Sequence, residues 1–317
     1  MASASSSVGV LKTTLLVFVV VSSFELCCRA RKLATLYQPP TDLMSYHQGV
    51  LLDGKLPLSI LWYGRFTTTQ KSIVSDFVLS LSPQHGKTVN GVSPKRPPVS
   101  DWWKIVETYT KLAKRENTHV TLSDQFSDES YSLGKILKRA QISELAKKAS
   151  QKAKLTLVLT DATVTVEGFC MNNCGFHGAV SEKKSAFVWV GNSETQCPGY
   201  CAWPFHQPLY GPQNPPLVSP NNDVGVDGMI INIAGLLAST VTNPFSNGYF
   251  QGPAEAPLEA ASACSGIYGK GAYPGYAGDL LVDSTTGSSY NAHGVNGRKY
   301  LLPALFDPST SSCSTLV

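Results

Sequence analysis

The sequence predicts a mixed α/β fold built as one disulfide-stabilised domain. An apolar, β-branched run at 56–64 is typical of a central strand, and several amphipathic stretches repeat apolar residues every three or four positions, as helices do. The third observation is a set of six cysteines in the second half of the mature chain. No internal repeat and no long Ser/Gly linker divides the chain, so one large domain is favoured over two small ones.

The first residues have the pattern of a secretory signal. One lysine precedes an apolar run at 13–24, and the CCRA sequence that follows places the small residues Cys28 and Ala30 at a signal-peptidase site. The run is shorter than the roughly 20 residues that span a bilayer. Polar and charged residues end it at once, which disfavours a buried N-terminal helix. We therefore expect a signal peptide at 1–30 and a secreted mature domain at 31–317 with no membrane span.

Strands and helices are expected to alternate in the first half of the mature chain. The stretch TTTQKSIVSDFVLSLS spaces its apolar residues four apart and has threonines available as N-cap. Ser100 is the expected N-cap of the helix that begins at DWWKIV, and Ser143 should cap the second of two helical pieces in LGKILKRAQISELAKKASQ. The expected strands are 56–64, 119–126, 155–169 (as one or two) and 185–192, and the expected helices are 67–82, 101–116 and 133–151.

The second half has a different texture. From 197 to 223 it is rich in Gly, Pro, Asn and aromatic residues, and such a loop is long for a compact domain unless disulfides or function hold it. Asp223 should then cap an apolar core helix at 224–243. Three glycines inside this helix cost about 1 kcal/mol each relative to alanine, so close packing must compensate. We expect a short helix at 254–264, Gly/Tyr-rich turns and a hairpin through 280–306 to complete the chain.

Charge divides the mature domain into two halves. Residues 31–185 hold 21 Lys and Arg against 13 Asp and Glu, a net of +8, whereas the Cys/Gly/aromatic-rich half, 186–317, holds 3 against 8, a net of −5. A basic half can attract an acidic polysaccharide, but its lysines are spaced like ordinary solvated helix faces, and we favour that interpretation. No motif indicates a nucleic-acid partner.

The cysteines indicate three disulfides. The six in question are Cys170, Cys174, Cys197, Cys201, Cys264 and Cys313. In an oxidising compartment an even count is typical of a disulfide framework. The two Cys-x3-Cys pairs alone would also be compatible with zinc, but the secretory signal and the two isolated cysteines favour disulfides. The pairing stays open, because six cysteines allow 15 arrangements.

Several long motifs resemble one plant family over essentially the whole mature chain. They are GFCMNNCGFHG, FVWVGNSETQCPGYCAWPFHQPLYGPQ, NNDVGVDGMIIN, NPFSNGYFQGPAEAPLEAASAC and YGKGAYPGYAGDLLVD. These stretches closely resemble the EXORDIUM-like proteins, also called the phosphate-induced protein family. The resemblance implies a protein of the extracellular space, apoplast or cell wall that is connected with growth, cell expansion and responses to brassinosteroid or carbon status. It implies no known reaction.

Four short stretches also follow the order seen in some secreted microbial zinc proteins: CGFH, TNP, GYF and EAASAC. In that zincin-like template the helix before TNP carries a metal-binding His-Glu-x-x-Glu sequence, whose His and two Glu fall here on Gly235, Leu236 and Ser239. A metal-binding helix needs two ligands one turn apart and a carboxylate that accepts a proton from bound water. These three residues supply neither. The resemblance implies at most a degenerate zincin-like architecture, and we expect no metal and no cofactor.

The remaining catalytic candidates are weak. Glu255 and Glu259 are four apart, and a helix would place both carboxylates on one face, as an acid/base pair requires. His177 and His206 are candidate bases or ligands, although a hydrogen-bonded structural histidine is the favoured interpretation of each. Carboxylates at this spacing are more often solvated or capping groups. The sequence therefore leans against an enzyme, and the alternative is a degenerate or unorthodox hydrolase acting on wall polymers or peptides.

Aromatic residues in Gly/Pro-rich segments suit a binding function. They are Trp203, Phe205, Tyr210, Tyr249, Tyr273 and Tyr276. Flat rings among Asn and Gln fit sugar or peptide faces, and the competing interpretation is that they fill irregular space over the disulfides. The sequence predicts a non-catalytic binding or signalling protein of the extracellular matrix. Its expected partners are a cell-wall polysaccharide or an extracellular receptor or peptide.

Overall fold

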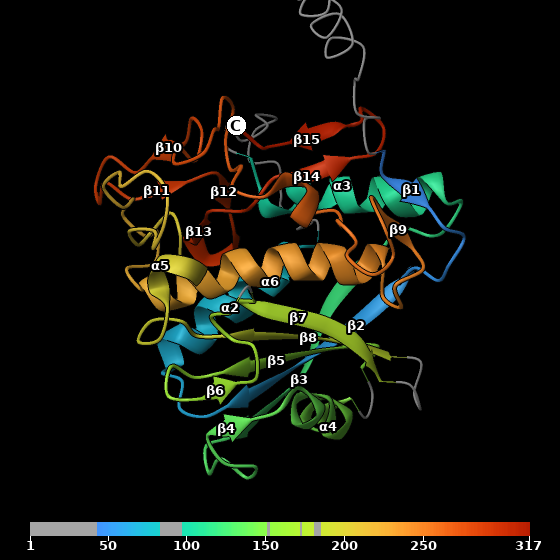
Figure 1. The fold of residues 1–317 in the computed structure, drawn as a ribbon, viewed down its shortest axis with the longest axis horizontal. Coiled ribbons are helices and arrows are strands. Elements are labelled where there is room, and N and C mark those ends of the chain that lie inside the picture. The colour runs from blue at the N-terminus through green and yellow to red at the C-terminus, as the bar shows by residue number, and fades with distance from the viewer. Residues whose placement is uncertain (1–42, 83–96, 151–152, 172, 181–184) are drawn as a thin grey trace, which may run out of the picture. The chain divides into compact units, whose positions relative to one another are not determined.

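The computed structural model describes residues 43–82, 97–150, 153–171, 173–180 and 185–317. Met44–Val317 form one compact unit in which helices and strands are mixed (Figure 1). This confirms the predicted mixed α/β class with disulfides. The expected signal peptide, 1–30, lies outside the described residues, and its boundary stays a prediction.

A five-stranded sheet forms the centre of this unit. Its strands, in spatial order, are β3 (His119–Asp128), β2 (Lys55–Tyr63), β5 (Leu155–Thr160), β8 (Ser185–Gly191) and β7 (Gly175–Val180). The first four are parallel to their neighbours, and β7 runs antiparallel to β8. Every residue of β5 and β8 is buried, as expected of parallel strands that are covered on both faces.

Helices cover the two faces of the sheet, and a hydrophobic core lies on each. On one face are α2 (Thr68–Ser80), α3 (Val99–Leu112) and α6 (Val224–Thr242), and on the other is α4 (Arg139–Ala149) (Figure 1). Side chains of β2 alternate between the two cores. Leu58 and Ile60 join the core of α2, α3 and α6, whereas Leu61 and Tyr63 join the core of α4.

Helix α6 is the central helix of the first core. The Asp223 side chain caps it by accepting a hydrogen bond from the Val226 amide at 2.8 Å, as predicted. In the described part of the chain, α6 is the one helix that is long and apolar enough to cross a membrane. However, 78% of its apolar stretch is buried inside the protein, as in a core helix. Two of its glycines allow neighbouring segments to approach the helix closely. A Cβ at Gly225 would lie 2.4 Å from Asn192, and a Cβ at Gly228 would lie 2.7 Å from Ala202. The predicted close packing is thus confirmed at these positions.

Short elements complete the unit. Two-residue or three-residue strands pair as β1 (Ser45–Tyr46) with β9 (Tyr249–Phe250), β4 (Ile136–Leu137) with β6 (Thr165–Val166), β10 (Leu281–Val282) with β11 (Ser289–Tyr290), β12 (Ala292–His293) with β13 (Lys299–Tyr300), and β14 (Leu305–Asp307) with β15 (Ser312–Ser314). The remaining helical elements are α5 (Pro198–Cys201) and the 3-10 turns η1 (Ser262–Cys264) and η2 (Val295–Gly297).

Several local predictions were wrong. Pro98, not Ser100, is the N-cap of α3, and Ser143 lies inside the single helix α4 instead of capping a second piece. The short helix expected at 254–264 shrinks to the 3-10 turn η1, because Pro257 interrupts the segment. The strand β7 falls in a segment where no strand was expected.

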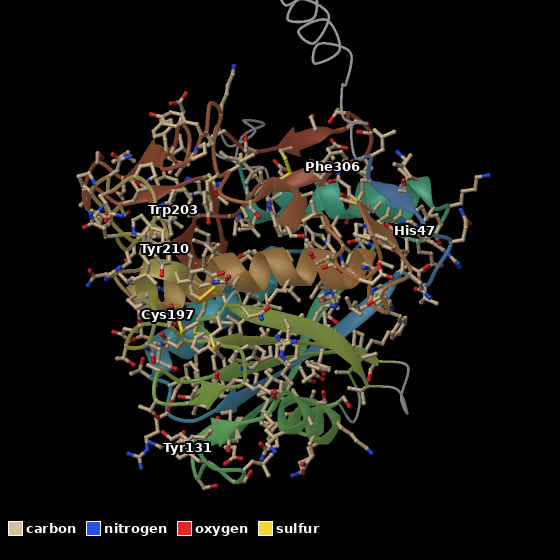
Figure 2. The ribbon with its side chains drawn as sticks, in the orientation of Figure 1. His47, Tyr131, Cys197, Trp203, Tyr210 and Phe306 are labelled. Atoms are coloured by element: carbon tan, nitrogen blue, oxygen red, sulfur yellow. A yellow bond between two sulfur atoms is a disulfide. The ribbon has the colours of Figure 1, made fainter. Side chains whose placement is uncertain are left out.

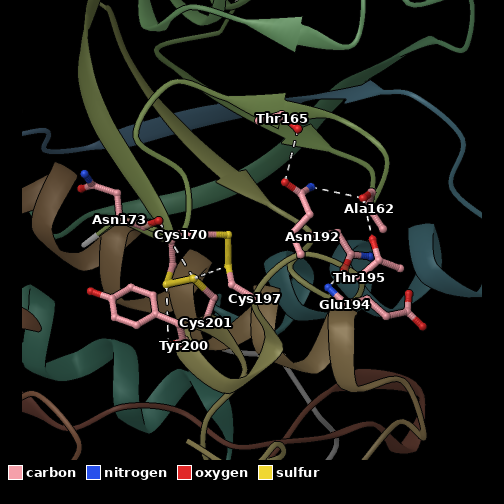
Figure 3. The surroundings of a disulfide bond; sticks show 12 residues. Ala162, Thr165, Cys170, Asn173, Asn192, Glu194, Thr195, Cys197, Tyr200 and Cys201 are labelled. Atoms are coloured by element: carbon pink, nitrogen blue, oxygen red, sulfur yellow. Dashed lines mark hydrogen bonds between the residues drawn. A yellow bond between two sulfur atoms is a disulfide. The ribbon is translucent and has the colours of Figure 1, made fainter. Parts of the chain in front are cut away.

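The predicted three disulfides are confirmed, and the structure supplies their pairing: Cys170–Cys197, Cys174–Cys201 and Cys264–Cys313. The first two join the turn before β7 to α5, and the Sγ atoms of Cys197 and Cys201 lie 3.7 Å apart (Figure 3). Both bridges therefore hold the same four-residue helix against the same turn. That helix leads directly into the loop that carries Trp203.

Candidate functional site

The loop that follows α5 is folded back on itself. The Phe205 amide donates to the Ala202 carbonyl at 2.8 Å, and the Leu217 amide donates to the Pro204 carbonyl at 2.9 Å. The peptide bond between Trp203 and Pro204 is cis. Trp203 is thereby held at the start of a proline-rich loop whose two ends are pinned together.

A tight hairpin faces this loop. Tyr273 and Tyr276 exchange backbone hydrogen bonds at 3.1 and 2.8 Å, and Gly275 between them has a φ of +90°, which favours glycine. The Asn214 side-chain amide donates to the Gly275 carbonyl at 2.8 Å. A Cβ at Gly275 would lie 2.6 Å from Pro212. The hairpin therefore packs directly on the proline-rich loop.

Two pockets lie between these segments. One has a volume of about 550 Å³ and the other about 430 Å³, and both fall in the range of about 300–1,000 Å³ that is usual for small-molecule sites. Trp203 and Gly275 line both of them. Figure 2 shows Trp203 and Tyr210 on the same side of the molecule. We call these two cavities the first and second aromatic pockets.

Four of the six candidate aromatic residues line the aromatic pockets. Trp203, Tyr210 and Tyr273 line the first, and Trp203 and Tyr276 line the second. The Tyr210 and Tyr273 side chains are 85% and 63% exposed. Exposed rings of this size beside a cavity are available to a ligand.

The other two candidate aromatic residues are core residues. Phe205 is 3% exposed and packs in a small cluster with Tyr268, and Tyr249 is 5% exposed and stacks on Tyr46 at 4.7 Å between ring centroids. Both rings fill the interior. This packing role is the competing interpretation of the sequence for all six aromatic residues. Their position corrects the expectation that they face a ligand.

Charged side chains are scarce in the aromatic pockets. Among the described residues, no Asp, Glu, Lys, Arg or His lines the first pocket, and the second has His206 and Asp279. The Tyr276 hydroxyl donates a 2.7 Å hydrogen bond to Asp279, and this bond raises the pKa of Tyr276. The uncharged polar groups are Ser265 in the first pocket and Asn214 and Ser289 in the second.

A second polar arrangement lies on the α6 side of the sheet. The His177 Nε2 atom is 3.0 Å from both carboxylate oxygens of Glu259, and the Asn243 side-chain amide donates to the same carboxylate at 2.7 Å. The side-chain oxygen of Asn243, Oδ1, accepts from the Gly248 amide at 2.7 Å. The four motifs CGFH, TNP, GYF and EAASAC each contribute one member, so they meet in one chain of hydrogen bonds. We call it the His177–Gly248 chain.

Strand β7 explains the direction of His177. Phe176 packs against Phe187 and Trp189 in the core of α4, so alternation along the strand turns His177 to the α6 face. A Cβ at Gly175, two residues earlier on the same face, would lie 2.7 Å from Leu236 of α6. The His177 Nδ1 atom is buried and has no hydrogen-bond partner among the residues that the structure describes.

The other two catalytic candidates stand apart from this chain. Glu255 is exposed in a turn and shares no helix face with Glu259. His206 is exposed, and its Nδ1 atom lies 3.0 Å from the neighbouring Gln207 carbonyl. The structure thus joins Glu259 to His177 and separates it from Glu255 and His206. Neither His177 nor Glu259 lines the aromatic pockets.

The template positions on α6 have packing roles. A Cβ at Gly235 would lie 3.2 Å from Ala261, and Ser239 is 3% exposed. Among the residues that the structure describes, no group of three or more His, Cys, Asp or Glu side chains could hold a metal ion. These contacts do not show a zincin-like architecture.

The sequence missed the residues that join the loop to the hairpin. Asn214, Pro212 and Gly275 set the shape of both aromatic pockets, yet each stands in a segment read as a turn-rich loop. The only signal was the density of Pro and Gly on both sides of the aromatic residues. Such residues give rigid, pre-formed turns without indicating which turns meet.

Known proteins match this chain over most of its length. The model of the phosphate-induced protein 1 conserved region matches residues 44–316. The chain is 58% identical over 309 residues to the protein PHOSPHATE-INDUCED 1 of Nicotiana tabacum, covering 95% of this chain and 97% of that protein. It is 55% identical over 312 residues to the protein EXORDIUM of Arabidopsis thaliana, covering 95% and 98%. It is 58% identical over 279 residues to the Arabidopsis protein EXORDIUM-like 1, covering 86% and 89%. The chain therefore belongs to the phosphate-induced protein 1 family, which includes the EXORDIUM and EXORDIUM-like proteins.

Proposed function

We propose that this chain is a secreted, non-catalytic protein of the plant cell wall that binds wall polysaccharide through the aromatic pockets and acts in growth. The family to which it belongs supports a role related to growth. Its link to cell expansion and to brassinosteroid or carbon status is part of the proposal. So is its place in the apoplast.

The observation that carries the proposal is the pair of pockets that Trp203 lines in common. Sugar rings bind proteins by laying their apolar faces on flat aromatic side chains, with polar groups at the ring edge for the hydroxyls. The pockets offer Trp203, Tyr210, Tyr273 and Tyr276 for the first role. Asn214 is among the groups available for the second.

The composition of the pockets supports binding without hydrolysis. A glycosidase requires two carboxyl groups across the scissile bond. In the part of the chain that the structure describes, no carboxylate lines the first pocket, and Asp279 is the one carboxylate of the second. A sugar held there would not lie between two described carboxyl groups.

Three disulfides support secretion, because such bridges form and persist in oxidising compartments. The direct measurement is N-terminal sequencing of the protein recovered from the medium of plant cells that express the full chain. We expect the mature protein to begin at Arg31. Retention of the full chain inside the cells would overturn this part of the proposal.

The binding proposal is tested by pull-down of the secreted protein on separated wall polysaccharide fractions. The double variant Tyr210→Ala/Tyr273→Ala removes two exposed rings of the first pocket, and we expect it to lose about tenfold or more in affinity. Phe126→Ala is the control, because Phe126 is a 40% exposed ring on β3 outside both pockets. If no fraction retains the wild-type protein, or if the double variant binds as the control does, the proposal fails.

A second candidate function rests on the His177–Gly248 chain. The convergence of its four motifs beside α6 supports a degenerate zincin-like frame in which His177 acts as the base of a hydrolase and Glu259 stabilises the imidazolium. This candidate predicts cleavage of a wall polymer or peptide that is lost in His177→Ala and kept in His206→Ala. Sensitivity of a cleavage activity to His206 instead of His177 would exclude it.

A further inference from the structure

We infer that the ligand of the aromatic pockets is a neutral glycan chain long enough to cross from the first pocket to the second over Trp203. This inference rests on the proposed function and specifies its ligand. The ligand is specified by its charge, which is zero, and by its minimum length, which must span both pockets. Both follow from the walls of the pockets.

The shared walls indicate one continuous ligand. Trp203 and Gly275 line both pockets, so the two cavities are neighbours that share these residues as a wall. A ligand confined to the first pocket would contact Tyr210 and Tyr273 but not Tyr276. A chain that passes Trp203 reaches all three rings. Sugar chains suit such a path because each unit repeats the same apolar face at the same spacing.

The charge of the walls indicates a neutral sugar. A uronate carboxylate transferred from water needs a cation or several donors to offset the loss of hydration. Among the residues that the structure describes, no Lys, Arg or His lines the first pocket, and in the second an anion would meet the Asp279 carboxylate as well as the His206 ring. Lys270 is paired with Asp279 across the hairpin backbone but belongs to neither wall.

The surrounding half of the chain adds to this discrimination. Residues 186–317, which supply every wall residue of both pockets, hold 3 Lys and Arg against 8 Asp and Glu, a net of −5. A half with so few cations offers a polyanion few partners, and a neutral chain needs none. An acidic wall polymer is therefore disfavoured at this site.

The pockets are also held in shape before a ligand arrives. Asn214 ties the loop to the hairpin through the Gly275 carbonyl, and the walls include Pro208, Pro212 and Pro215. Proline fixes the backbone of the loop, so little conformational entropy is lost on binding. Aromatic pockets that are formed in advance suit an extended, semi-rigid chain.

The experiment is calorimetric titration of the secreted protein with two series of oligosaccharides of matched length. One series is a neutral β-linked glucan, from disaccharide to octasaccharide, and the other is an oligogalacturonide. We expect the affinity for the glucan to rise with length until the chain spans both pockets and then to level off. We expect the galacturonide to bind about tenfold or more weakly at each length.

Two variants locate the binding. Tyr210→Ala changes only the first pocket, so the long glucan should fall to the affinity of the short one, a loss of about tenfold. Asp279→Asn removes the carboxylate of the second pocket and should narrow the gap between glucan and galacturonide. Phe126→Ala is the matched aromatic control outside both pockets and should titrate as the wild-type protein does.

The outcomes separate this inference from the proposed function. If neither sugar series nor any wall fraction binds, both fail together. If glucans bind with an affinity that does not change with length, or if the galacturonide binds as tightly as the glucan, the inference fails and the proposed function stands. Tight binding of a proline-rich peptide that is lost in Tyr210→Ala, with no binding of sugar, would assign the pockets to a peptide and overturn both.

Discussion

His177 on β7 and Glu259 before η1 form a close pair although 82 residues separate them: the imidazole Nε2 atom lies 3.0 Å from each carboxylate oxygen. The two side chains are only 14% and 12% exposed. Asn243 at the end of α6 donates to the same carboxylate. The pair therefore fixes the segment after β9 against both the edge strand and the central helix.

Glu259→Ala should lower the free energy of unfolding by about 2–3 kcal/mol, because it leaves the His177 and Asn243 donors without their acceptor in a mostly buried place. The measurement is urea denaturation of both variant and wild type. Glu255→Ala is the matched control, since Glu255 is exposed four residues earlier, and its effect should stay within about 0.5 kcal/mol. Equal effects of the two substitutions would show that the pair adds nothing to stability.

Two glycines of α6 should respond to alanine in opposite directions. A Cβ at Gly228 would lie 2.7 Å from the Ala202 Cβ and 3.2 Å from the Cys201 carbonyl, so Gly228→Ala must push α5 away and should cost about 1–3 kcal/mol. A Cβ at Gly235 meets only Ala261, at 3.2 Å, and Pro303 at 3.9 Å. Alanine gains about 1 kcal/mol over glycine in a helix, so Gly235→Ala should be neutral or stabilising. Thermal unfolding of both variants tests this, and a loss at Gly235 as large as at Gly228 would contradict it.

The parts of the fold set by local pattern were predictable from sequence. The buried run of β2, the Thr67 cap of α2 and the Asp223 cap of α6 each follow from a few adjacent residues. Strand β7 was not predictable in this way, because GFHGAV has two glycines and one β-branched residue. Its pairing with β8 holds it extended, and two disulfides anchor the turn that precedes it.

The candidate site was predictable in its residue types and not in its geometry. Aromatic residues in Pro/Gly-rich segments indicated a binding surface, but exposed Tyr210 and buried Phe205 stand in the same loop with no local pattern that separates them. The meeting of His177 with Glu259 depends on where β7 packs against α6, which is a long-range property. Helical spacing wrongly joined Glu259 to Glu255, because Pro257 between them prevents the helix.

The Cys170–Cys197 and Cys174–Cys201 bridges should stabilise the protein redundantly. Either bridge alone closes a loop of 27 residues in the unfolded chain, but once one is present the other closes only a very short loop. Serine replacement of one pair should therefore cost less than about 2 kcal/mol, and replacement of both about 3–4 kcal/mol. Denaturation of the two double variants and the quadruple variant tests this. Losses that simply add would contradict redundancy.

Asp227 should make the stability depend on pH. It lies in the first turn of α6 and is 2% exposed, and burial raises the pKa of its carboxyl to about 7, although hydrogen bonds from Asn221 oppose the rise. The nearby negative charge of Asp223 also raises the pKa of Asp227. The folded protein thus holds this proton more tightly than the unfolded chain, whose aspartate titrates near pH 3.9. Between these two values the folded state binds more protons, so the contribution of Asp227 to stability falls as pH rises.

Asp227→Asn tests the assignment because asparagine carries no charge at any pH. Relative to the wild type, we expect the variant to gain stability steadily as pH rises from about 4 to about 7 and the difference to level off above that range. The measurement is the urea midpoint at each pH. Asp124→Asn is the control: this carboxylate is exposed on β3, so its curve should run parallel to that of the wild type. A constant difference between Asp227→Asn and the wild type across the range would show that Asp227 titrates at an ordinary pKa, and that its burial inside α6 leaves its charge as well solvated as in the unfolded chain.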